Sequence, residues 1–348
     1  MTKSAITHFL FLVLLVGMSR LVNAQSLSPE AQMLVKRGQA ALDKDDFALA
    51  IRDLEQARQL APKNSGVLRP LLLCYLQSGR LNEAVKLGRE AVASSPNDTE
   101  LHHWLGLAYF KVGQNTEARE ELQQAENLAV GRSDIHFDLA LVLLSQVQYA
   151  AAASQLETAL RINPSSSLAH LLLGRAYQNT NRTLDAIDQF RSALRIDPNA
   201  PLAHYHLGFA YASLGQNPQA ISEYETEVSR TPDSPEVQYQ LGRCLLESGD
   251  WKSAVTHLQR ATELDASHEN VFYELGKALL LSGNVVGATG ALQRAIALNP
   301  TDPSPHYQLA RTLDKSGDPV AARKEWQRFA ELKKSHQETG GMATGRNQ

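Results

Sequence analysis

Apolar residues recur along the chain in two helical stripes that repeat every 34 residues. With positions numbered as slots 1 to 34 of each unit, slots 4, 7, 8 and 11 have the i, i+3, i+4, i+7 spacing of one helix face. Slots 20, 24 and 27 form a second stripe. Slot 15 lies between the stripes and is mostly glycine, with Asn181 in one unit, which is typical of a left-handed helix end. The pattern predicts pairs of helices joined by a tight turn.

Three series of small or helix-breaking residues share this period. Slot 8 is Gly or Ala in every unit except for Leu72. Slot 20 is alanine in all nine units, and slot 32 of the first eight units is proline, with Val130 and Ala266 as exceptions. The units therefore start at residues 31, 65, 99, 133, 167, 201, 235, 269 and 303, and the ninth ends at 336. Small residues at slots 8 and 20 allow close helix packing, whereas the neighbouring Ala153 is expected to tolerate a polar side chain.

The sixth unit carries the most complete motif: His204-x-x-Leu207-Gly208-x-x-Tyr211, then Ala220, Tyr224 and Pro232. This resembles the tetratricopeptide repeat family, whose pattern is Trp-x-x-Leu-Gly-x-x-Tyr, Ala, Phe and Pro at the same steps. The resemblance covers residues 31–336. It implies an all-α fold, a right-handed α-solenoid of nine tandem helix-turn-helix repeats with a concave inner wall. The fourth unit departs from the pattern, with Val147 at the turn.

The two ends of the chain differ from the repeats. Lys3, the apolar stretch 9–18 and Val22-Asn23-Ala24 predict a signal peptide over residues 1–24. The stretch is shorter than the roughly 20 residues of a membrane span, although an uncleaved N-terminal anchor is the alternative. Residues 25–30 form a short lead-in, and residues 337–348, with Gly340-Gly341, are expected to be a disordered tail. The chain is predicted to be exported, and hence periplasmic or secreted.

Charge and motifs exclude several classes of function. The formal net charge is −3, and the predicted leader holds two basic residues and no acid, so the mature chain is more acidic still. An acidic protein is a poor candidate for nucleic-acid binding. The sequence contains no catalytic motif or phosphate-binding loop, so we predict no enzyme activity, no cofactor and no small-molecule substrate. Membrane association is expected only if the N-terminal segment is uncleaved.

Two residue types outside the repeat motif need an interpretation. Cys74 and Cys244 fall five repeats apart, beyond the ~7 Å Cα separation that a disulfide allows, so two free, buried thiols are predicted. A histidine occupies slot 4 in units three to six and in unit nine, as His102, His136, His170, His204 and His306. One interpretation is a pH-responsive or metal-binding ladder. The other is a packing position whose polar tip reaches a loop or water.

The family resemblance implies that slots 5, 9 and 12 of the first helix face the concave groove. In units two to four these slots are mainly apolar: Leu73, Leu76, Leu107, Phe110, Phe137, Leu141 and Leu144. In later units slots 5 and 9 hold the candidate partner-binding residues Arg175, Tyr205, Phe209, Tyr239, Arg243, Tyr273, Lys277, Tyr307 and Arg311. Such a groove suits a peptide with hydrophobic anchors and an acidic part. These side chains could alternatively serve only to pack neighbouring helices.

The resulting functional prediction is an exported, non-enzymatic scaffold or adaptor that binds a protein or peptide partner in this groove. Two alternatives remain open from the sequence. One is a self-associating structural array, and the other is a non-catalytic accessory subunit of an envelope enzyme complex.

Overall fold

The computed structural model describes residues 27–344, with side chains as far as Gln337. Within this range all regular elements are α-helices, arranged as nine pairs. The first helices are α2 (Pro29–Leu42), α4 (Ser65–Gln77), α6 (Thr99–Lys111), α8 (Ser133–Ser145), α10 (Ser167–Asn179), α12 (Ala203–Ser213), α14 (Pro235–Glu247), α16 (Glu269–Leu281) and α18 (Pro303–Ser316). The second helices are α3 (Phe47–Leu60), α5 (Leu81–Ser94), α7 (Asn115–Leu128), α9 (Tyr149–Ile162), α11 (Thr183–Ile196), α13 (Asn217–Arg230), α15 (Trp251–Leu264), α17 (Val285–Leu298) and α19 (Pro319–Thr344).

The turn between the two helices of each pair contains a residue in the left-handed region. Gly79, Gly113 and Gly215 have φ values of 76°, 84° and 70° at slot 15. Asn181 and Val147 adopt φ values of 59° and 61° at the same slot. A β-branched residue is strained in this region, so the surrounding helices hold Val147 there. The fourth repeat therefore keeps the register of the others without the glycine.

The closest approach within a helix pair is set by slots 8 and 24. A methyl group added at Gly242 would lie 2.6 Å from Leu258 Cγ, and one added at Gly208 would lie 3.0 Å from the Tyr224 ring. Slot 8 is therefore small because the slot-24 side chain occupies its space. The second repeat reverses the sizes along the sequence, with Leu72 at slot 8 and Gly88 at slot 24. A methyl group added at Gly88 would lie 2.8 Å from Leu105 Cδ1, so this glycine makes room for the first helix of the next repeat.

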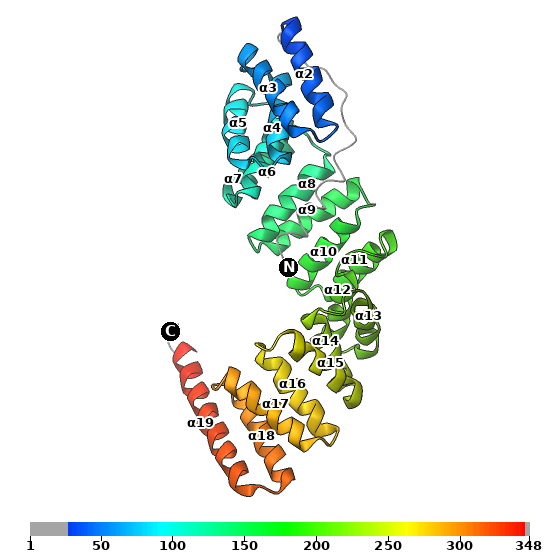
Figure 1. Ribbon diagram of the computed structural model, residues 1–348, viewed down its shortest axis with the longest axis vertical. Coiled ribbons are helices and arrows are strands. Elements are labelled where there is room, and N and C mark those ends of the chain that lie inside the picture. The colour runs from blue at the N-terminus through cyan, green and yellow to red at the C-terminus, as the bar shows by residue number, and fades with distance from the viewer. Residues whose placement is uncertain (1–26, 345–348) are drawn as a thin grey trace. The chain divides into compact units, whose positions relative to one another are not determined.

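The chain divides into two compact units, residues 1–181 and 182–348, each considered on its own below. In the first unit the helices α2 to α10 pack consecutively, and in the second unit α11 to α19 do the same (Figure 1). Consecutive first helices also contact each other, as α2–α4, α4–α6 and α6–α8 in the first unit and α12–α14, α14–α16 and α16–α18 in the second. The first helices of each unit line one surface, which we call the inner wall of that unit. The predicted all-α array of helix-turn-helix repeats is confirmed for the described residues.

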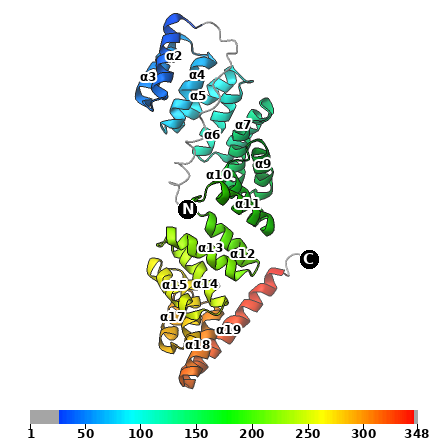
Figure 2. The same cartoon turned by 90° about the vertical axis from the view of Figure 1, so that its right-hand side faces the viewer.

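The last helix differs from the prediction. Helix α19 has 26 residues, against 14 for its partner α18, and continues past the predicted boundary at 336 as far as Thr344 (Figure 2). The segment 337–344, predicted to be disordered, is therefore helical. Slot 32 holds Lys334 in place of the helix-stopping proline of most other repeats. The repeats with Val130 and Ala266 at this slot also lack the proline, but α7 and α15 end at Leu128 and Leu264, where a further first helix packs on each of them. No helix of the described residues follows α19, so nothing turns the chain there. The predicted signal peptide and residues 345–348 lie outside the described residues.

The burial of Ala153 argues against the expectation that a polar side chain is tolerated there. This side chain at slot 21 is 5% exposed, and Ile51 and Ile187 at the same slot are also buried. Slot 21 therefore belongs to the buried surface of those repeats, and a polar side chain at Ala153 would lose its hydration.

Among residues 27–344, none of the helices combines the length and the apolar character needed to cross a bilayer.

Candidate partner-binding surfaces

Most of the candidate partner-binding residues lie on the inner wall of the second unit. Tyr205 and Phe209 are on α12, and the pairs at slots 5 and 9 follow on α14, α16 and α18. All eight of these side chains are half-buried or exposed, including Tyr239, Tyr273 and Tyr307. Arg175 is half-buried on α10 in the first unit.

In the last three repeats the slot-5 tyrosine lies beside the slot-9 cation of its own helix, whereas Tyr205 has Phe209 at slot 9. The Lys277 ammonium lies 5.3 Å from the centroid of the Tyr273 ring, and the Arg311 guanidinium lies 5.7 Å from that of Tyr307. These distances are within the range of a cation–π interaction. The predicted pairing of one tyrosine with one cation per helix turn is thus present in the structure. The use of these pairs in partner binding stays a prediction.

Carboxylates on the same helices reduce the positive charge of this surface. Glu274 Oε2 lies 2.7 Å from Lys277 Nζ, and Glu247 Oε1 lies 3.9 Å from Arg243 Nε. Glu236 accepts hydrogen bonds from the Tyr205 hydroxyl at 3.3 Å and from the Gln240 amide at 2.8 Å. The sequence interpretation missed these acids, although Glu274 and Glu247 follow the i, i+3 and i, i+4 spacing that pairs charges on a helix.

A cluster of aromatic rings lies between α12 and α13. The Tyr205 ring is 6.1 Å from Tyr224 and 6.5 Å from Phe209. Burial raises the pKa of the Tyr205 and Tyr224 hydroxyls, and the nearby Glu236 carboxylate raises both further. Both phenols therefore remain protonated and can donate hydrogen bonds at physiological pH.

The inner wall of the first unit is apolar. Leu107 and Phe110 on α6 and Leu141 on α8 are each half-buried, so part of each side chain faces solvent. The related residues Leu73, Phe137 and Leu144 are also half-buried, whereas Leu76 is 5% exposed and belongs to the core. The predicted apolar stripe is therefore accessible at every position except Leu76.

Four of the slot-4 histidines join the two helices of their own repeats, and His170 contacts the Pro164 carbonyl oxygen of the preceding turn at 3.2 Å. In the third repeat, His102 Nδ1 lies 2.7 Å from Glu121 Oε2, while Nε2 lies 2.9 Å from the carbonyl oxygen of Pro96 in the preceding turn. The same contact, between Nδ1 of the slot-4 histidine and Oε2 of the slot-23 glutamate, recurs at 2.6 Å in His204–Glu223 and His306–Glu325. The packing interpretation, with the polar tip reaching a loop, is the one that fits these contacts.

The seventh repeat exchanges the two residue types. Gln238 at slot 4 accepts a contact of 2.8 Å from His257 at slot 23 and donates to the Pro232 carbonyl at 2.9 Å. As in the third repeat, the side chains at slots 4 and 23 and the carbonyl oxygen of the preceding turn are linked to one another. Among the described residues no group of three or more His, Cys, Asp or Glu side chains could hold a metal ion.

Cys74 and Cys244 are both free and buried, as predicted. Burial raises the pKa of the Cys74 thiol to about 12 and that of Cys244 to about 11. Neither thiol is therefore a reactive nucleophile at neutral pH.

Comparison with known families decides the identity of the repeats. A tetratricopeptide repeat model matches residues 35–99, 137–201, 171–235, 205–269 and 239–303. Two further models of this repeat match residues 75–136 and 291–324. The chain belongs to the tetratricopeptide repeat family. The family matches together run from residue 35 to residue 324 and include all the candidate site residues. No curated protein sequence matches the chain.

Several solved tetratricopeptide repeat structures are similar in fold. The C-terminal part of a repeat-containing protein from Cytophaga hutchinsonii has a TM-score of 0.57 at 16% identity, covering 69% of this chain and 99% of its own. A protein from Parabacteroides merdae has a TM-score of 0.51 at 16% identity, covering 72% and 100%. YrrB, described as a protein with an unusual peptide-binding site, has a TM-score of 0.50 at 24% identity, covering 54% and 97%. At these identities the likeness shows the fold alone.

Proposed function

We propose that this tetratricopeptide repeat protein is an exported, non-enzymatic scaffold or adaptor that binds a protein or peptide in the concave groove of its inner wall. The observation that carries the proposal is the row of half-exposed tyrosine and cation pairs on three consecutive first helices, α14, α16 and α18. Side chains fixed in place by a helix array lose little conformational entropy when a partner binds, and Tyr and Arg are enriched at binding hot spots. YrrB, which has a similar fold, is described as binding peptide.

The groove chemistry favours a partner with two kinds of side chain. The half-buried leucine and phenylalanine side chains of the first unit fit hydrophobic anchors. In the second unit, the carboxylates leave Arg311 as an exposed cation beside an aromatic ring. A carbonyl or carboxylate oxygen of a partner could contact both that cation and the tyrosine hydroxyl. The inner wall of the first unit therefore suits a segment with apolar residues, and that of the second unit suits a segment that also carries acids.

The groove is tested by removing two cations that the array does not need for folding. We expect Arg243→Ala with Lys277→Ala to leave helicity and melting nearly unchanged, because each cation forms its ion pair with a carboxylate of its own helix, a contact that contributes little to stability. A partner isolated from the native envelope fraction, and identified by mass spectrometry, should bind the variant roughly tenfold more weakly. Its affinity should also depend less on salt.

The matched control changes Arg195 and Lys252 to alanine, because these exposed cations lie on the second helices α11 and α15. It should bind like the natural protein. Equal affinity of the groove variant and the natural protein would mean that the tyrosine and cation pairs serve packing only. Mass that rises with concentration in light scattering would instead favour a self-associating array.

Export is a separate part of the proposal and rests on the composition of residues 1–24. We expect the protein recovered from the source cell to lie outside the cytoplasm with Gln25 as its first residue. Intact-mass measurement of the purified protein checks this. A mass that includes residues 1–24 would favour the uncleaved anchor.

A further inference from the structure

Helix α19 carries an unusual concentration of positive charge. Between Pro319 and Gln337 it holds five cations and two carboxylates, in a chain with a formal net charge of −3. Both carboxylates already have partners, because Glu325 contacts His306 at 2.6 Å and Glu331 contacts Arg328 at 3.2 Å. No ion pair among the described residues engages Arg323 or Lys324. The positive charges of Arg323 and Lys324 are therefore not neutralised by an ion pair within the described part of the protein.

The same face of the second helix is covered in earlier repeats of the second unit. Slot 21 holds Ile187, Ile221 and Val255 on α11, α13 and α15, which are buried or half-buried, and helices α12, α14 and α16 pack on these second helices. The eighth repeat has the half-buried Thr289 at this slot. In the ninth repeat slot 21 is Arg323, which is exposed, as is Ala330 at slot 28. A face that is apolar and covered in those repeats is thus cationic and open on α19.

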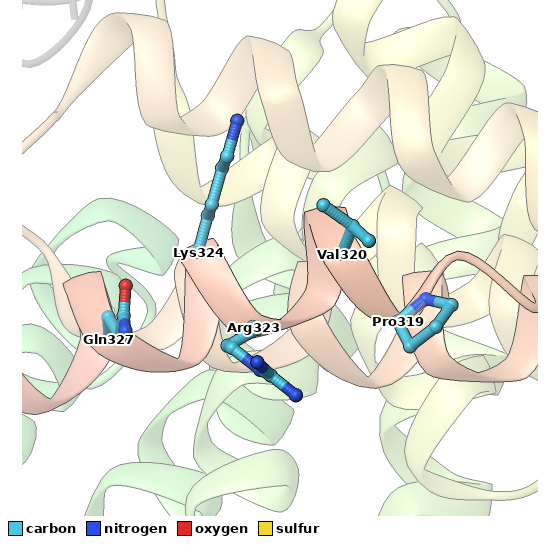
Figure 3. A pocket seen from close by; sticks show the side chains of 5 residues that line it. All are labelled: Pro319, Val320, Arg323, Lys324 and Gln327. Carbon is cyan, nitrogen blue, oxygen red and sulfur yellow. The ribbon is translucent and has the colours of Figure 1, made fainter.

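A shallow hollow of about 250 Å³ lies on this face near the start of α19. It is lined by Pro319, Val320, Arg323, Lys324 and Gln327, and Figure 3 shows the two cations extending from the helix in different directions. Val320 is 71% exposed and gives the hollow an apolar edge. The surface therefore combines two unpaired cations, an amide and one apolar contact.

We propose that this face of α19 is a second docking surface, separate from the inner wall, which binds an acidic segment of a protein partner. Charge complementarity is the basis of the assignment: closely spaced cations without internal partners attract carboxylates and accelerate their association. The Gln327 amide can contact the backbone of such a segment. Binding at this surface depends on salt because the charges are exposed.

An acidic protein segment fits this face better than a lipid bilayer. A helix that lies in a membrane interface needs a broad apolar face below its cations. Val320 is the single large apolar side chain exposed on the described part of α19. Trp326 and Phe329 are instead packed against Tyr307, with ring centroids 5.3 Å away in both cases. One exposed valine provides too little apolar area for insertion.

Binding of a fluorescent, glutamate-rich helical peptide to the full protein tests the proposal. We expect saturable binding that weakens as salt is raised. Arg323→Glu with Lys324→Glu should weaken it at least about tenfold, because two attractive charges become repulsive. The control, Arg195→Glu with Lys252→Glu, changes the net charge equally on exposed positions of α11 and α15. It should retain most of the affinity.

Two further measurements separate this surface from its alternatives. Arg243→Ala with Lys277→Ala should leave peptide binding unchanged, and loss of binding in this variant would place the acidic peptide in the groove and overturn the proposal. Equal weakening by the two charge reversals would show that only net charge matters, which also overturns it. Vesicles containing anionic phospholipid should not bind measurably at physiological salt. Tight vesicle binding that depends on Arg323 and Lys324 would assign the face to a membrane instead.

Discussion

At the scale of single residues, two glycines in the eighth repeat should respond to alanine with opposite signs. A methyl group at Gly276 would lie 2.6 Å from Leu292 Cγ, while one at Gly290 meets nothing within 4 Å. Gly276→Ala should lower the free energy of unfolding by about 1–3 kcal/mol, through overpacking. Gly290→Ala should raise it by about 0.5–1 kcal/mol, because glycine is unfavourable inside a helix. Chemical denaturation measures both, and destabilisation by both variants would contradict the assigned contact.

Acid should destabilise the seventh repeat through His257. Burial lowers the pKa of this imidazole, while Glu225 and Asp250 oppose the shift. The unfolded chain then binds more protons than the folded one, so stability is lost as the pH falls through the unfolded pKa of about 6.5. We expect His257→Gln, which keeps a hydrogen-bonding partner for Gln238, to lose less stability than the natural protein between neutral pH and pH of about 5. Melting curves across this range provide the comparison, and parallel losses would show that the pKa of His257 is the same in the folded and the unfolded chain.

Single residues also show where the sequence stops being informative. The slot-8 glycines and their large slot-24 partners could be predicted, because size alternates within one period. The ion pair between Glu274 and Lys277 depends on rotamers, and slot numbers alone did not reveal it. The burial of Ala153 was not predicted, because the regular alanine series at slot 20 marks only the centre of the contact between the helices. Periodicity identifies a helix face, and the width of the buried face depends on the neighbouring helix.

At the scale of helices, α19 is long because no proline stands at its slot 32 and no further helix of the described residues follows it. Leu332 is its last buried residue within the described side chains, so the helix beyond it gains little from packing. Lys334→Pro should end the helix near this point, since proline removes a backbone donor and clashes with the preceding turn. We expect a smaller far-UV circular dichroism signal with nearly unchanged melting. A large drop in melting temperature would instead show that residues after Leu332 stabilise the array.

Helix positions were otherwise predictable from the repeat period, and at several junctions two signals mark the boundary. A breaking residue ends one helix and a capping side chain starts the next, as where Asp98 accepts a hydrogen bond from Leu101 N at 3.3 Å before α6. The turn at Val147 lacks its glycine and still forms, because packing of the flanking helices outweighs the cost of one strained residue. The candidate site was predictable only as a row of side chains on one face. The charge balance of the site was not predictable, since Glu236 lies on α14, the first helix of the repeat that follows Tyr205.

At the scale of the whole molecule, a repeat array should transmit a local change only to its neighbours. In such arrays each repeat contacts the next, so stability is approximately a sum of repeat and interface contributions. Gly276→Ala loosens the contact between α16 and α17, and within the second unit α15 packs on α16 and α18 packs on α17. Hydrogen exchange should therefore accelerate in α15 to α18. The first unit, residues 1–181, has its own internal contacts, and amides of α4 to α8 should exchange at unchanged rates. Comparison of the two regions by mass spectrometry gives the range of coupling directly. Equal acceleration in α4 to α8 would show that the chain unfolds as one cooperative body, and a partner bound to one unit would then stabilise the other.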